Sequence, residues 1–93
     1  MIKCFVVVTG GLPHPVLHAR KAKAVLKFLK ELDGLIAIHI FDRYHTFLCF
    51  GTLNQAKVAR NRIRAEGNPA GNNIMSAEIS DDRQTLNVLD RAD

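Results

Sequence analysis

The sequence predicts an α+β domain in which a four-stranded antiparallel sheet carries two helices on one face. Four segments are rich in β-branched and aromatic residues, and two others place apolar residues at helical spacing. Glycine and proline separate most of these segments. The resulting order is strand, helix, strand, strand, helix, strand, which 93 residues can arrange as one domain.

The first strand and the first helix are the clearest elements. Residues 2–8 form a β-branched run that ends at Gly10. Pro15 suits the first turn of a helix, where the N–H that proline lacks would remain unpaired, and Gly34 supplies a stop after residue 32. Between them, apolar residues recur at Ala22, Val25, Leu26, Leu29 and Leu32.

A hairpin, a second helix and a fourth strand follow. Residues 35–41 and 44–50 are both β-rich and only two residues separate them, as in a hairpin. The Thr-Leu-Asn-Gln sequence at 52–55 is a capping box that begins a helix, and Gly67 ends it. Residues 74–80 alternate between apolar and polar side chains and predict the fourth strand.

The last part of the chain is predicted to be an acidic C-terminal extension, residues 81–93, that follows a single domain of residues 1–80. Two basic and five acidic residues lie at positions 78–93. Leu86 and Leu89 lie at helical spacing and favour a short terminal helix.

Two registers are open for the hairpin. A two-residue turn would place Ile38 on the same face as Phe47, whereas a three-residue loop would place it with Leu48 in the core. The three-residue loop is favoured, because Asp42-Arg43 rarely forms a type I′ turn and because isoleucine is usually buried. The core would then include Ile36, Ile38 and Ile40.

This order of elements corresponds to the ferredoxin-like βαββαβ topology, in which the first and third strands are neighbours at the centre of the sheet. The face without helices is then rich in apolar residues, whereas a solvated antiparallel face normally alternates with polar ones. We therefore expect a platform or interface on this face made of Phe5, Val7, His39, Phe41, His45 and Phe47.

The formal net charge is +4, and the two helical segments carry most of the positive charge. A positive surface favours polyanions or acidic protein surfaces as partners. The predicted basic surface consists of Arg20, Lys23, Lys27, Lys30, Lys57, Arg60 and Arg64.

Residues 43–50 resemble the octamer of the RNA-recognition-motif family, which runs basic, Gly, aromatic, Gly/Ala, aromatic, aliphatic, any residue, aromatic. The matching positions are Arg43, Phe47, Leu48 and Phe50, and His45 supplies a ring at the third place. Residues 4–6 are similar to the start of that family's hexamer, whereas Tyr44 and Thr46 replace small residues and the hexamer's later Asn is missing. The resemblance implies a base-stacking platform made of Phe5, His45 and Phe47.

The sequence contains no constellation for catalysis, cofactor binding or metal binding. A Cys-x-x-Cys and a Gly-Arg-rich phosphate cradle are both missing from the first loop. The histidine pairs 14/18 and 39/45 are interpreted as surface or partly packed side chains. Cys4 and Cys49 are expected to face opposite sides of the sheet as free thiols. We therefore expect no enzymatic activity, no cofactor and no metal.

The chain begins with a strand rather than a signal-peptide pattern, and no apolar run reaches the length of a membrane span. These features favour a cytoplasmic protein with no membrane partner. The first hypothesis is a noncatalytic regulatory or adaptor domain that acts by protein contacts, as a homodimer through its apolar sheet face. The alternative is an RNA- or single-stranded nucleic-acid-binding module that uses the aromatic platform.

Overall fold

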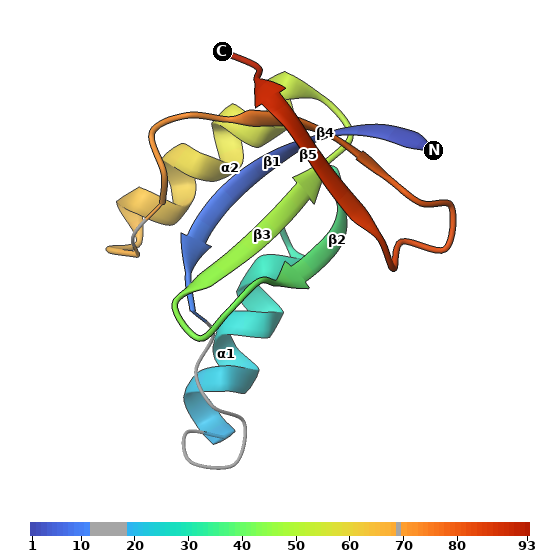
Figure 1. Ribbon diagram of the computed structural model, residues 1–93. Coiled ribbons are helices and arrows are strands. Elements are labelled where there is room, and N and C mark those ends of the chain that lie inside the picture. Colours follow the sequence, from blue (N-terminus) through green and yellow to red (C-terminus); the bar gives the residue numbers. More distant parts are fainter. Residues whose placement is uncertain (12–18, 69) are drawn as a thin grey trace.

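The computed structural model describes residues 1–11, 19–68 and 70–93, in which two helices pack against a five-stranded antiparallel sheet (Figure 1). The elements are β1 (Ile2–Gly10), α1 (Ala19–Lys30), β2 (Leu35–Ile40), β3 (His45–Phe50), α2 (Leu53–Ala65), β4 (Met75–Ile79) and β5 (Leu86–Arg91). The strand order is β2-β3-β1-β4-β5. The α+β class is confirmed, but the predicted count of four strands is wrong. No helix of the described residues is long and apolar enough to cross a membrane.

α1 packs on the sheet through an apolar stripe that includes the buried Leu29, and Leu32, which follows the helix, is buried in the same core. After the helix, Gly34 has a φ of +79°, which only glycine adopts at low cost. A side chain at this position would also collide with Gln55 of α2. The predicted start of this helix near Pro15 lies outside the described residues.

α2 begins and ends as its sequence predicts. Thr52 is the N-cap, and its Oγ1 accepts a 3.1 Å hydrogen bond from the backbone N–H of Gln55. At the other end Gly67 has a φ of +81° and donates its N–H to the Arg64 carbonyl at 2.9 Å. The next residue, Asn68, donates to the Ile63 carbonyl at 3.1 Å, so the last carbonyls of α2 are paired.

The hairpin between β2 and β3 has the favoured three-residue loop. The backbone N–H of Phe41 donates to the His45 carbonyl at 3.1 Å, so the loop comprises residues 42–44. Ile38 accordingly pairs with Leu48, on the face that the helices cover.

Only one of the three isoleucines expected in this core contacts it. The β2–β3 pairing is irregular between Leu35 and Ala37, and this bulge turns Ile36 to the face without helices. Ile40 keeps the expected orientation but is 69% exposed. No local pattern predicts this bulge, because it depends on how the two strands pair.

Apolar residues are buried on both faces of the sheet. The face below the helices carries the helix-side core, which consists of Val7, Leu29, Leu32, Leu48, Phe50, Ala56, Ala59, Ile63 and Ile74. The other face carries a smaller second core, which consists of Cys4, Val6, Cys49, Ala77 and Ile79. All five members of the second core have no exposed surface, although neither α1 nor α2 packs on this face.

β5 supplies part of the cover of the second core. The predicted terminal helix is wrong, since residues 86–91 pair antiparallel with β4. β5 crosses in front of the sheet in Figure 1, and Leu86 packs against the second core together with Ile36 and Ala37 of β2. The twist of the sheet thus brings one edge strand over to the other.

The last two residues of the chain bond to Ile74, just before β4, and Asp93 also pairs with Arg60 of α2. The Asp93 carboxylate accepts the backbone N–H of Ile74 at 2.9 Å and lies 3.3 Å from Nη1 of Arg60. The neighbouring Ala92 donates its N–H to the Ile74 carbonyl at 2.7 Å. Chiefly because of the bond from Ile74, the pKa of Asp93 is lowered from its ordinary value.

Candidate functional site

An open groove lies between the β2–β3 hairpin and β5. We call it the aromatic groove, and its lining consists of His39, Ile40, Phe41, Phe47, Leu86 and Val88. Its volume is about 440 Å³, within the usual range for ligand pockets. None of the lining residues is an acid, a lysine or an arginine. The groove therefore suits apolar side chains better than charged groups.

Aromatic rings form one wall of this groove. Phe41 and Phe47 are stacked, with ring centroids 5.2 Å apart and an interplanar angle of 12°. His45 approaches Phe41 edge-on at 6.5 Å and 72°. Phe47 is half-buried, but Phe41 is 68% exposed, so a large part of its apolar surface is available for contact.

The loop that presents Phe41 is built around Asp42. Its carboxylate accepts the backbone N–H of Tyr44 at 2.8 Å and Nδ1 of His45 at 2.9 Å. The bond from Tyr44, with a further contribution from His45, lowers the pKa of Asp42. These local bonds fix the three-residue loop.

The opposite side of the groove is held by His39. Its Nε2 lies 2.9 Å from the backbone carbonyl of Arg83, in the turn between β4 and β5. Since a carbonyl oxygen can only accept, Nε2 carries the hydrogen. In the same turn, Ser80 accepts the N–H of Thr85 at 3.0 Å, and Asp82 accepts that of Gln84 at the same distance. The bond between β2 and this turn helps to hold β5 across the sheet.

The structure brings together four of the six predicted platform residues and separates two. His39, Phe41, His45 and Phe47 share one face. Phe5 and Val7 lie on the helix side instead, where both contact the helix-side core. The register of β1 against β3 is the reason, because Val8 rather than Val7 pairs with Phe47. The predicted common face for Phe5 and Phe47 is therefore wrong.

Sequence reasoning missed the groove residues Leu86 and Val88. Leu86 and Leu89 suggested a helix, whereas Leu86 and Val88 on either side of Asn87 also fit the period of two that a strand requires. The second pattern is the one that the structure adopts, since residues 86–91 pair antiparallel with β4.

The predicted basic surface divides into two parts. Arg20, Lys23, Lys27 and Lys30 are exposed on α1. Arg60 and Arg64 instead serve the fold, because Arg60 donates to the carbonyl of Asn72 at 2.8 Å and Arg64 to that of Ala70 at 3.1 Å. Lys57 is half-buried on α2.

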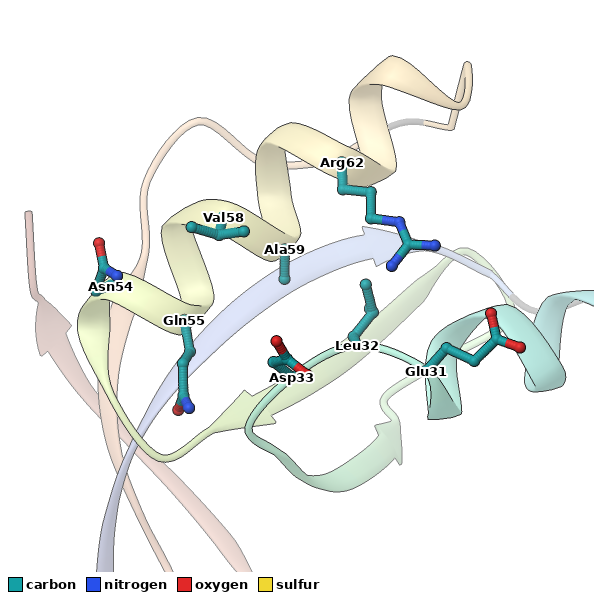
Figure 2. A pocket seen from close by; sticks show the side chains of 8 residues that line it. All are labelled: Glu31, Leu32, Asp33, Asn54, Gln55, Val58, Ala59 and Arg62. Atoms are coloured by element: carbon teal, nitrogen blue, oxygen red, sulfur yellow. The ribbon is translucent and has the colours of Figure 1, made fainter.

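A second, smaller cavity of about 210 Å³ lies between the end of α1 and α2 (Figure 2). Its lining consists of Glu31, Leu32, Asp33, Asn54, Gln55, Val58, Ala59 and Arg62. Arg62 extends towards the end of α1 in Figure 2, and its guanidinium lies 5.0 Å from the ring centroid of Phe28. With acids, amides and a guanidinium mixed in a small space, the cavity favours water over a ligand of one charge.

The two cysteines lie on the same face of the sheet rather than on opposite faces. Val6 pairs with Cys49, and Cys4 is two residues from Val6, so all three point into the second core. The prediction of free thiols is confirmed. Burial, together with the neighbouring Cys4, raises the pKa of Cys49 to about 12, and burial also raises that of Cys4. Both thiols are therefore poor nucleophiles.

In the part of the chain that the structure describes, no group of three or more His, Cys, Asp or Glu side chains could hold a metal ion. His14 and His18 lie outside it. Comparisons of the chain with protein-family models, with curated proteins and with solved structures found no match.

Proposed function

We propose that this chain is a noncatalytic adaptor or regulatory domain that acts by protein contacts, and that it forms a homodimer through the free edge of β2 and the aromatic groove. We also propose that it is a ferredoxin-like βαββαβ domain to which β5 is added. The order of its first four strands and the position of its two helices in the chain support this assignment.

The observation that carries the proposal is the exposure of Phe41 beside an uncharged groove. Phe41 is 68% exposed and Ile40 is 69% exposed, and both line the groove. Full burial of such a side chain contributes about 1.5–3 kcal/mol. Aromatic side chains near the centre of an interface are also among those that contribute most to binding.

The free edge of β2 adds backbone partners to this surface. Phe41 donates its N–H across the hairpin, and successive N–H groups of a strand point in opposite directions. The N–H and C=O groups of Ile40 and Ile38 therefore point away from β3. β2 contains no charged residue and no proline to discourage pairing with another strand, whereas β5, at the other edge of the sheet, contains Asp90 and Arg91.

A second copy of the chain is the partner that fits this edge most simply. Two β2 strands related by a two-fold axis can pair antiparallel, so that each supplies the same donors and acceptors to the other. Because β2 is uncharged, no like charges meet across the axis. The pairing would bring the two Ile40 side chains and the two aromatic grooves close to one another.

Stacking of nucleic-acid bases on the same rings has less support. Phe5, which the stacking platform requires, packs against the helix-side core. The groove lining also lacks lysine and arginine, although phosphate contacts supply much of the affinity for nucleic acid.

The mass of the protein in solution tests the proposal. Light scattering over a range of concentrations is expected to give twice the chain mass of 10.4 kDa. Ile40→Lys places a charge at the paired edge and Phe41→Ser removes the exposed ring, and each is expected to raise the dimer dissociation constant at least about tenfold, or about 1.4 kcal/mol.

Val58→Lys is the matched control, because Val58 is 59% exposed but lies on α2, away from the groove. This variant should keep the dimer mass. A wild-type protein that stays monomeric, or a control that dissociates as readily as Ile40→Lys, would contradict the proposed dimer. Circular dichroism of each variant establishes that its fold is retained.

A further inference from the structure

α1 carries a stripe of positive charge on its exposed side. The stripe consists of Arg20, Lys23, Lys27 and Lys30. Their spacing of three, four and three residues places them on one face of the helix. At about 1.5 Å per residue the stripe extends over about 15 Å.

These four side chains are not used by the fold in the way that Arg60 and Arg64 are. Among residues 1–11, 19–68 and 70–93, no ion pair includes any of the four. The acids nearest to them in sequence are Glu31 and Asp33, which lie beyond the C-terminal end of α1. The positive charge of the stripe is therefore available to an external partner.

The position of α1 leaves room for a large partner. Its N-terminal half extends past the end of the sheet in Figure 1. The aromatic groove, by contrast, lies on the face of the sheet that the helices do not cover. A partner on the stripe would leave the groove free.

We infer that the stripe on α1 binds the phosphate backbone of double-stranded nucleic acid, without preference for sequence. This inference goes beyond the proposed dimer and does not depend on it. A DNA duplex carries one negative charge per about 1.7 Å of its axis, so a stripe of this length faces several phosphates at once. Lysine, which makes up three of the four positions, is a flexible point charge that binds phosphate in many orientations.

The neighbouring side chains favour a duplex over a single strand. Single-strand binding relies on rings on which bases stack, but Phe28, the aromatic residue of α1, is half-buried and in contact with Arg62. α1 contains no Asn or Gln to bind base edges, which is why we expect no sequence preference.

The test is the salt dependence of binding to a short labelled DNA duplex, measured by fluorescence anisotropy. Four neutralised phosphates predict a slope of about −3.6 for the logarithm of the association constant against that of the salt concentration. Affinity should accordingly fall roughly 150-fold between about 50 and 200 mM salt. Replacing the three lysines of the stripe with Gln should reduce the slope to about −0.9.

Two matched variants distinguish binding by the stripe from an effect of the net charge alone. Replacing Lys3, Arg43 and Lys57 with Gln lowers the net charge of +4 by the same three units and should leave the slope unchanged. The combined variant Lys23→Arg, Lys27→Arg and Lys30→Arg should retain binding. Circular dichroism establishes that each variant keeps its helices.

Four results would overturn the inference. The first is equal loss of binding in the stripe variant and in the charge-matched control. The second is tighter binding to the single-stranded form of the same oligonucleotide, and the third is tighter binding to phosphatidylserine-containing vesicles than to the duplex. A wild-type protein that does not bind the duplex even at low salt would overturn it as well.

Discussion

The two faces of the sheet are both apolar, but they are covered in different ways. α1 and α2 cover the helix-side core, where Phe50 has no exposed surface. The second core, where Val6 has no exposed surface either, is covered by side chains of the sheet itself, among them Leu86 of β5 and Ile36 of β2. An apolar sheet face therefore requires a cover, but a twisted sheet can supply that cover from its own edge. Near the aromatic groove this face keeps an exposed ring, since Phe41 is 68% exposed.

The largest change in the free energy of unfolding is expected for Phe50, which lies on the opposite face of the sheet from Phe41. Phe50→Ala should lower the free energy of unfolding by about 3–5 kcal/mol, because it leaves a cavity in the helix-side core. Phe41→Ala removes a ring that is 68% exposed and should cost less than about 1 kcal/mol in the monomer. Urea denaturation of the two variants measures the difference. Equal losses would mean that the groove is closed.

The burial of the second core can be tested by a substitution that removes fewer atoms than Phe50→Ala. Val6→Ala should lower the free energy of unfolding by about 2 kcal/mol if β5 buries this face as fully as described. Val58→Ala, on the exposed side of α2, is the control and should change it by less than about 0.5 kcal/mol. If the two valines gave the same small change in urea denaturation, the second face would be open to water.

The hydrogen bond from His39 to the turn before β5 should contribute less to the free energy of unfolding. His39→Ala removes the donor to the Arg83 carbonyl and should cost about 1 kcal/mol. Hydrogen exchange of the backbone amides in β5 should become faster, since the turn loses its attachment to β2. His39→Gln keeps a donor at similar reach and should restore most of the protection. Unchanged exchange in His39→Ala would show that the twist of the sheet alone holds β5 in place.

The smallest effect concerns pH. The folded state lowers the pKa of Asp93 below its ordinary value of 3.8, so its contribution to stability is present above that value and is lost as pH falls through the lowered pKa. Asp93→Asn should therefore be less stable at neutral pH and lose less stability on acidification. Thermal unfolding from neutral pH to below 3 measures both effects. A wild-type profile in Asp93→Asn would contradict the proposed anchoring.

Local patterns predicted the elements well where the cause lies within a few residues. The bond from Gln55 to Thr52, the glycine after each helix and the loop at residues 42–44 all depend on neighbours in sequence. Four of the platform residues were likewise placed on one face, because the period of a strand fixes which side chains share a side. Phe5 was misplaced, since β1 is apolar on both faces and its own pattern cannot choose between them.

The sequence by itself determined both helices, the first four strands and the short hairpin, because each follows from capping, periodicity and turn chemistry over a short span. Only the tertiary structure decided the register of β1 against β3, the bulge at Ile36 and the pairing of residues 86–91 as a strand with β4. Each of these depends on contacts between strands that are far apart in the chain. A shift of one residue in such a pairing exchanges every side chain between the two faces, so the location of the site followed from the pairing.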